Sequence, residues 1–354
     1  MKYFNQMTAH RDMTVRRVAL MLSSVTLGVL IGITGLQLQH LSGQASAATL
    51  SLCGNSKTSG TPPIKHVLLV MLENHSYKQV VGNSAAPFQT SLTQSCGVAT
   101  AMFGATHTSA ANYLALSAGE YPAASPPGCG SISTCHDNND NLYHQLETAG
   151  LSWKSYQESM NGACSTSGSN YKIGHNPPLF YTDLSHASCL ANDLPVPDLT
   201  AQSGALWTNL QNQTLPSLSW VNPNLLNDGE GPISITDNWV KKFITTVQQS
   251  ASYQSGNTAV IITYDEGTGA DSVKNENCAN QALDMPVVNK TSAHQDSCHV
   301  PFFVVYPYTP AGSSDGAFFD HYSVTKTIQD LFGLPYLAHA NDYQTNSLIG
   351  HLGL

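Results

Sequence analysis

Residues 68–82 read LLVMLENHSYKQVVG, an apolar run that passes directly into Glu73, Asn74 and His75. The run belongs to a predicted strand, Ile64–Leu72, with two apolar faces, as in a parallel sheet that helices cover on both sides. A core strand normally ends in a turn built from Gly, Asp or Ser. This one ends in side chains that can bind a metal ion or move a proton, which predicts a functional site at the end of the strand.

A second strand ends in the same way. The predicted strand Thr258–Tyr264 is followed by Asp265 and Glu266. Parallel strands end at one edge of a sheet, where α/β proteins bind ligands. Asp265-Glu266-Gly267 alone is equally typical of a turn, but two matching strand ends favour a site. Carboxylates brought together there repel one another unless a cation neutralises them, and oxygen ligands suit a hard or borderline divalent ion. We therefore expect the metal ligands Glu73, Asn74, Asp265 and Glu266.

The remaining pattern alternates strands with helices, which predicts an α/β fold with a mostly parallel central sheet flanked by helices. The further expected strands are Ser152–Gln157 and His299–Tyr306, and the expected helices are Ser109–Ala118, Asn139–Ala149, Thr236–Gln249 and Ser323–Leu331. Residues 159–235 and 268–298 are polar, contain cysteines and are expected to form long loops.

Residues 104–122, GATHTSAANYLALSAGEYP, offer a nucleophile. Ser109 or Thr108 lies at the start of the expected helix, where Ser and Thr are also the usual capping residues. A hydroxyl at a helix N-terminus meets unpaired N–H groups and the positive end of the dipole, which favour a bound phosphate. Asn112, one turn later, is a candidate to donate its amide to a phosphoryl oxygen.

The chain has 14 histidines, and any single one is more typical of a structural or surface position than of a catalytic one. His107 precedes the candidate nucleophile, and His175 lies in an expected loop. His299 and His321 stand at the boundaries of predicted elements. We expect His107 and His321 to be catalytic, and His175 and His299 to bind substrate.

The N-terminal region predicts export. Residues 1–47 combine an early cationic stretch, a long apolar run and a small-residue cleavage site at Ala45-Ser46-Ala47, as in a secretory signal. The apolar run is also long enough for an uncleaved membrane anchor. Residues 48–62 are expected to be a flexible linker, and residues 63–354 the catalytic domain. The protein is therefore expected to be secreted, or anchored if the signal is retained.

The charge pattern excludes some partners. The net charge is −9 at pH 7, and no arginine follows Arg17. This composition argues against nucleic acid, which proteins bind through cationic contacts to phosphates. It also excludes an arginine clamp for a phosphate group.

All eight cysteines follow residue 47, and an even number in an exported chain suggests disulfides. Proximity in the sequence favours the pairs Cys129–Cys135, Cys164–Cys189, Cys278–Cys298 and, from the remaining two, Cys53–Cys96. A zinc site is the weaker alternative, since no Cys-x-x-Cys pair occurs.

These motifs together resemble the bacterial phosphoesterase family, which contains phospholipases C and AcpA-like acid phosphatases within the alkaline-phosphatase superfamily. The resemblance runs in order from about residue 64 to 337, through HVLLVMLENHSY, THTSAANYLALSAGEYP, LYHQLETAGLSWKSYQESM, HNPPLFY, SLSWVNPNLLNDG, DNWV, VIITYDEG, HVPFFVVYP and HYSVTKTIQDLFGLPYL. It implies an alkaline-phosphatase-like fold with long disulfide-bearing loops.

The resemblance also implies a mechanism. Glu73, Asn74, Asp265 and Glu266 would be ligands of an active-site metal, and a Ser or Thr at the start of the 109–118 helix would attack phosphorus. The pattern His-x-Ser-x-x-Asn-Tyr places the nucleophile at Ser109, whereas the phospholipase pattern would choose Thr108.

One stretch departs from the family. After Asn227-Asp228 the family usually continues with Met-His-Asp, but this chain reads Gly229-Glu230-Gly231. We expect one divalent ion (Zn, Ca, Mn or Mg), or a second site assembled differently.

The expected function is metal-dependent hydrolysis of phosphate esters through a covalent phospho-enzyme. The substrate is a small phosphate ester or a phospholipid headgroup, which includes the possibility of a membrane-surface substrate, and no obligate protein partner is evident. A sulfatase is disfavoured because the chain lacks the required Cys/Ser-x-Pro-x-Arg motif. The alternatives are a non-catalytic binding protein on the same fold and a phosphodiesterase in which a metal-bound water attacks directly.

Overall fold

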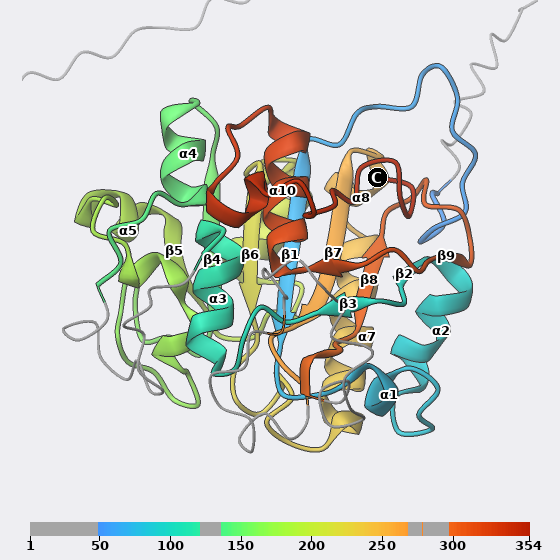
Figure 1. The fold of residues 1–354 in the computed structure, drawn as a ribbon, viewed down its shortest axis with the longest axis horizontal. Helices are drawn as coiled ribbons and strands as arrows, with labels where there is room; N and C mark the ends of the chain where they lie inside the picture. The colour runs from blue at the N-terminus through green and yellow to red at the C-terminus, as the bar shows by residue number, and fades with distance from the viewer. Residues whose placement is uncertain (1–48, 121–135, 268–277, 279–296) are drawn as a thin grey trace, which may run out of the picture. The chain divides into compact units, whose positions relative to one another are not determined.

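The structure is a computed structural model, and it describes residues 49–120, 136–267, 278 and 297–354. Figure 1 shows these residues as a central sheet with helices on both faces. The predicted signal sequence and the predicted pair Cys129–Cys135 lie outside the described residues. Within the described part of the chain, no helix is both long and apolar enough to cross a membrane.

The main sheet has eight strands in the order β5-β4-β6-β1-β7-β8-β2-β9. In that order the strands are Asp193–Val196, Trp153–Glu158, Leu218–Asn222, His66–Leu72, Thr258–Tyr264, Phe302–Val305, Gly97–Ala99 and Ser313–Asp315. The first five strands are parallel to one another, whereas β8 is antiparallel to both β7 and β2. The mostly parallel α/β sheet is therefore confirmed.

Two predictions about strands were wrong in detail. The strand expected from His299 begins at Phe302, because His299 instead forms an isolated bridge with Phe103. The expected loop 159–235 contains β5, α5 (His186–Asn192), α6 (Gly204–Asn212) and β6, and β6 is a direct neighbour of β1. Strand β6 is hard to recognise because its sequence, LSWVN, includes buried polar residues, among them Asn222, which accepts a hydrogen bond from the Trp220 indole.

Two helices cover one face of the sheet, and one of them begins with the candidate nucleophile Ser109. These are α3 (Ser109–Ala118), predicted with the same bounds, and α10 (His321–Phe332), and the two contact each other. Figure 1 shows them in front of the sheet and α7 (Ile233–Gln248) behind it. The apolar stripe of α7, formed by Trp239, Phe243 and Val247, is buried.

Shorter elements complete the described chain. The helices are α1 (Tyr77–Val80), α2 (Pro87–Ser95), α4 (Leu142–Thr148), α5 (His186–Asn192), α6 (Gly204–Asn212) and α8 (Ala251–Gln254). A small sheet pairs β3 (Met102–Phe103) with β10 (Phe319–Asp320).

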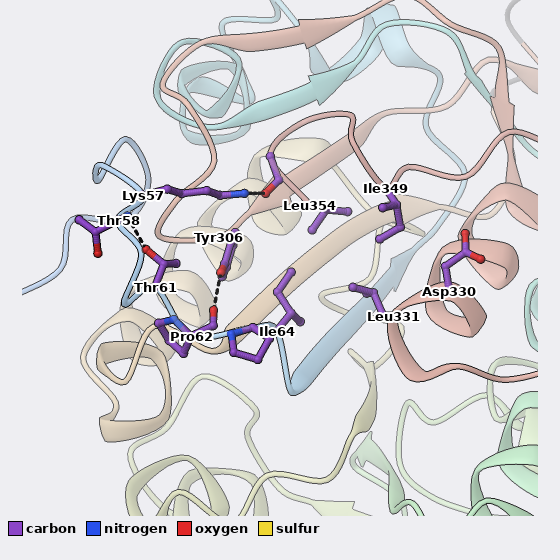
Figure 2. Close-up of a pocket in the computed structure, with 12 residues that line it drawn as sticks. Lys57, Thr58, Thr61, Pro62, Ile64, Tyr306, Asp330, Leu331, Ile349 and Leu354 are labelled. Carbon is purple, nitrogen blue, oxygen red and sulfur yellow. Dashed lines mark hydrogen bonds between the residues drawn. The ribbon is translucent and has the colours of Figure 1, made fainter.

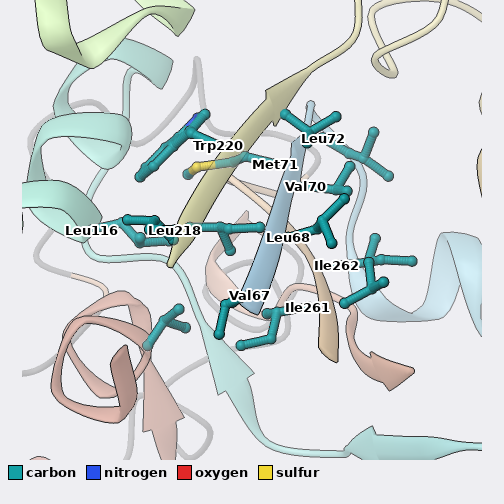
Figure 3. Packing of buried hydrophobic residues seen from close by; sticks show 14 of the residues in the cluster. Val67, Leu68, Val70, Met71, Leu72, Leu116, Leu218, Trp220, Ile261 and Ile262 are labelled. Carbon is teal, nitrogen blue, oxygen red and sulfur yellow. The ribbon is translucent and has the colours of Figure 1, made fainter. Parts of the chain in front are cut away.

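The core lies around β1, the strand with which the sequence analysis began. Residues 67–72 and all of β7 are buried, as predicted for strands covered on both faces. Figure 3 shows Leu116 of α3 near Leu218 on one side of β1, and Leu68 and Val70 on the other side. At about 25 cal/mol per Å² of apolar surface removed from water, such strands hold the sheet rigid enough to position side chains at its edge.

The segment preceding β1 is attached to the domain, contrary to the flexible linker expected over 48–62. Cys53 is disulfide-bonded to Cys96, and the Gly54 N–H donates to the Thr309 carbonyl at 2.8 Å. The predicted pairs Cys164–Cys189 and Cys278–Cys298 are also present. The three predicted disulfides that fall on described residues are therefore confirmed.

Candidate active site

The ends of β1 and β7 bring the predicted metal ligands together. Leu72 and Tyr264, the last residues of these parallel strands, are partners in the ladder, so Glu73 and Asp265 leave the sheet side by side. The Asn74 N–H donates to Asp265 Oδ1 at 3.0 Å, and the Asn74 amide lies 3.4 Å from Glu73 Oε2. Asn74 has a φ of 56°, an uncommon conformation for a residue other than glycine. The backbone therefore bends sharply to place both carboxylates at one point.

Helix α3 presents Ser109 to this point. The Ser109 hydroxyl donates to Glu73 Oε2 at 2.8 Å. Thr108 is the N-cap, with φ 91° and no side-chain capping bond, and its N–H donates to Glu266 Oε2 at 3.0 Å. A β-branched residue held at positive φ is strained, and such strain concentrates at functional sites. Of the two candidate nucleophiles, Ser109 contacts the carboxylate cluster through its hydroxyl, and Thr108 contacts it through its backbone N–H.

His107 positions Glu266. Its Nδ1 lies 3.0 Å from Glu266 Oε2, and both side chains are buried. The other ring nitrogen, Nε2, lies 3.4 Å from the sulfur of Cys278 in the Cys278–Cys298 disulfide. The disulfide thus packs against the residue that orients one predicted metal ligand.

Asn112 and His321 hold the loop that carries His107. Asn112 Oδ1 accepts from the N–H groups of Ala105 and Thr106, and its amide donates to the Thr106 carbonyl. His321 Nδ1 accepts from the Ala105 N–H at 3.3 Å, and its Nε2–H donates to the Tyr264 carbonyl at 3.0 Å. Burial lowers the pKa of His321 to about 4. These contacts do not fit the predicted roles of phosphoryl donor and acid/base catalyst, because main-chain groups engage the side-chain atoms that those roles require.

His299 is also placed differently from the prediction. Its ring is stacked between Tyr77, at 4.6 Å, and Phe103, at 5.1 Å, and its Nε2 donates to the Thr100 carbonyl. This packing is that of a structural aromatic residue, and it does not fit the predicted substrate contact.

His175, in contrast, reaches the cluster. Its Nε2 lies 3.2 Å from Glu73 Oε1, and its ring stacks on Tyr113 at 5.0 Å between centroids. The Tyr113 hydroxyl donates to the same Glu73 oxygen at 2.7 Å. On the other side of the ring, His175 Nδ1 lies 3.6 Å from Asp228 Oδ2.

Sequence reasoning missed Tyr113 and Asp228. Tyr113 stands four residues after Ser109 on the same helix, so it faces the same way, and this spacing was the available signal. Asp228 lies in the Asn-Asp motif that carried the family resemblance, but nothing in the sequence indicates that its carboxylate faces His175.

The electrostatics of the cluster call for a cation. Burial raises the pKa of Glu73 well above its ordinary value, and the neighbouring charges of Asp265 and Asp228 raise it further. The pKa of Asp265 is raised for the same reasons, by burial and then by Glu266. Asp265 Oδ2 is buried without a hydrogen-bond partner. Buried carboxylates with an open oxygen are costly unless they are paired or bind a metal, so this donor set fits a divalent ion.

A separate cavity of about 530 Å³ lies near the start of β1, not near its end. Figure 2 shows Lys57, Tyr306 and Leu354 around it. The Lys57 ammonium already donates to the Gly353 carbonyl at 2.9 Å. The cavity lacks the convergent carboxylates of the β1–β7 edge, and we do not assign the chemistry to it.

Comparisons with known proteins found relatives that are named as phosphatases. The probable acid phosphatase of Kluyveromyces lactis is 26% identical over 299 residues, which cover 81% of this chain and 63% of that protein. The phosphatidylinositol-3-phosphatase of Mycobacterium tuberculosis is 26% identical over 291 residues, covering 80% of this chain and 82% of that protein. The chain therefore spans less than two thirds of the yeast relative but most of the mycobacterial one.

Solved structures show the same fold at low sequence identity. A protein in the alkaline phosphatase superfamily from Vibrio parahaemolyticus matches with a TM-score of 0.50 and 12% identity, covering 86% of this chain and 74% of its own. The lipoteichoic acid synthase of Listeria monocytogenes matches with a TM-score of 0.53 and 13% identity, covering 81% and 76%. The model of the Phosphoesterase family matches residues 83–335, a span that includes Ser109, His175 and Asp265, and the chain belongs to this family.

Proposed function

We propose that this protein is a metal-dependent phosphoesterase that hydrolyses phosphate esters through a phosphoserine formed on Ser109. The observation that carries the proposal is the 2.8 Å hydrogen bond from the Ser109 hydroxyl to Glu73, at the N-terminus of α3 and beside carboxylates from two strand ends. Family membership and relatives named acid phosphatase support phosphoric esters as the substrate class.

In this proposal Glu73, Asn74, Asp265 and Glu266 hold the divalent ion. When bound, the ion supplies positive charge that lowers the pKa of a nearby hydroxyl and neutralises phosphoryl oxygens. The mixed set of carboxylate and amide oxygens favours no single metal, so Zn, Ca, Mn and Mg all remain compatible.

Ser109 attacks phosphorus in the first step. A bond forms between Oγ and phosphorus while the bond from phosphorus to the leaving oxygen breaks, and the Oγ proton has Glu73 Oε2 as its hydrogen-bond acceptor. The first N–H groups of a helix lack carbonyl partners, so the start of α3 is oriented to donate to phosphoryl oxygens. Water then cleaves the phosphoserine. Catalysis of this kind consists mainly of positioning and charge stabilisation.

Export is part of the proposal. The three disulfides found among the described residues support an oxidising compartment. The signal sequence proposed for residues 1–47 can be tested by N-terminal sequencing of the protein recovered from culture medium. A mature chain that begins near residue 48 is expected.

Turnover of p-nitrophenyl phosphate compared with p-nitrophenyl phosphorylcholine tests the function and separates a monoester substrate from a phospholipid headgroup. At least one should be hydrolysed, a chelator should abolish the activity, and a divalent ion should restore it. Hydrolysis of neither compound after metal reconstitution would favour a non-catalytic binding protein on this fold.

A further inference from the structure

The two oxygens of Glu73 face different groups. Oε2 accepts from Ser109 and lies near the Asn74 amide, which is the side used by the proposed chemistry. Oε1 accepts from Tyr113 and lies 3.2 Å from His175 Nε2. One buried carboxylate therefore connects the nucleophile to a second group of side chains.

That second group has the donor arrangement of a metal site. A Glu73 oxygen, a His175 nitrogen and a Glu230 oxygen all lie within 4.8 Å of one another. Ligands of one zinc ion lie about 2.0–2.2 Å from the metal, so their atoms are roughly 3–4 Å apart. Glu230 is exposed, so its side chain is not fixed by burial.

Asp228 gives an independent indication of a cation. Asp228 is 1% exposed, and its Oδ2 atom has no hydrogen-bond partner. The nitrogen His175 Nδ1 lies 3.6 Å from this oxygen. Histidines that bind metals normally direct their other ring nitrogen to a carboxylate, which fixes the tautomer and the ring orientation. With Nδ1–H directed to Asp228, the lone pair of Nε2 points toward Glu73.

The backbone holds Asp228 and Glu230 at this place. Gly229, between them, has φ 131°, and a Cβ built on it would lie 2.2 Å from the Glu73 carbonyl oxygen. The Glu73 N–H donates to the Asp228 carbonyl at 3.0 Å. Glycine is therefore required at 229, and the turn presents an acidic side chain on each side of it.

The charges of the site favour a second ion. If ionised, the carboxylates of Glu73, Asp228, Glu230, Asp265 and Glu266 carry five negative charges. One divalent ion would leave three of these uncompensated before an anionic phosphate ester enters, and two divalent ions would leave one.

We propose that Glu73, His175 and Glu230 bind a second divalent cation, with Asp228 orienting the His175 ring and Glu73 bridging the two ions. An imidazole with two carboxylates suits zinc or a similar first-row ion better than magnesium or calcium. This inference deepens the proposed function. It rests on that proposal at one point only, the assignment of Glu73 as a ligand of the first ion.

Zinc stoichiometry tests the second site directly. Protein without a histidine tag is stripped with a chelator, dialysed against Zn²⁺ and analysed by inductively coupled plasma mass spectrometry. Every protein carries His144→Ala, because the surface cluster of Asp140, His144 and Asp183 could also take zinc. The parent should bind two ions, and Glu230→Gln should bind one with unchanged affinity.

Two further variants make the test specific. Asp228→Asn should lower the affinity for the second ion by about 10–100-fold, as expected for a carboxylate that orients a metal-binding histidine. Glu147→Gln, which alters an exposed carboxylate on α4, should still bind two ions. Thermal melts of each variant check that the fold is retained.

One ion in the parent, or two ions in Glu230→Gln, would overturn the inference. Ester hydrolysis measured on the same samples separates the two proposals. A one-ion protein that hydrolyses ester refutes the second site and leaves the function standing, whereas a two-ion protein without turnover refutes the function alone.

Discussion

Replacing Tyr113 with phenylalanine removes one hydrogen bond from the centre of the site and nothing else. The Tyr113 hydroxyl donates to Glu73 Oε1 at 2.7 Å, and the residue is buried. Hydrogen bonds to charged groups contribute about 1.5–3 kcal/mol. At about 1.4 kcal/mol per factor of ten, Tyr113→Phe should weaken metal binding by roughly 10- to 100-fold, which is also the range observed for groups that support metal ligands.

Tyr143→Phe is the matched control. Tyr143 is another fully buried tyrosine, but its hydroxyl has no hydrogen-bond partner. Removing an unpartnered buried hydroxyl should leave metal affinity unchanged and be neutral or stabilising for the fold. Affinity is measured by competition with a zinc-sensitive dye on chelator-stripped protein. Equal affinities for the two variants would refute the assigned role of Tyr113.

The remaining predictions concern the nucleophile, a disulfide and a buried acid. Ser109→Ala should lower kcat by several orders of magnitude without changing the melting temperature, and Thr108→Ala should retain activity; the reverse result would move the nucleophile to Thr108. Replacing Cys278 and Cys298 with serine opens a loop with a sequence separation of 20 and should lower the free energy of unfolding by about 3 kcal/mol in denaturant titrations; an unchanged value would contradict this. Burial raises the pKa of Asp193 to about 7 from 3.8, so its contribution to stability is present below about pH 4 and lost as pH rises through 7. Asp193→Asn should therefore match the wild type near pH 4 and exceed it at pH 8 by up to about 4 kcal/mol; equal stability at pH 8 would count against the burial argument.

The strands that could be predicted from sequence are those in which hydrophobic pattern and structure agree. Strand β7 has the predicted bounds, and β1 ends at the predicted residue, because both are buried on both faces and read as continuous apolar runs. Strand β6 could not be recognised, because it contains the polar residues Ser219 and Asn222, and the side-chain hydrogen bonds of buried Asn222 form only in the folded protein. The antiparallel direction of β8 could not be predicted from the sequence either, since an apolar run does not indicate the direction of its strand.

The site could be located from sequence, but the partners of its side chains could not. Matching strand ends place Glu73 beside Asp265, because parallel ladders determine where chains leave a sheet. Position predicts a substrate contact for Asn112 and a catalytic role for His321, yet their polar atoms bind main-chain groups of residues 105 and 106 and of Tyr264 in β7. Such assignments depend on where side chains point, which spacing alone does not determine.

The central claim is that a phosphoryl group passes through Ser109. Mixing metal-loaded enzyme with p-nitrophenyl phosphate, quenching in acid within the first turnover and mapping the peptides by mass spectrometry measures this directly. We predict one added phosphoryl group on Ser109, and none in Ser109→Ala treated in the same way. Phosphate on Thr108, or turnover with no phosphorylated peptide at any time point, would contradict the account.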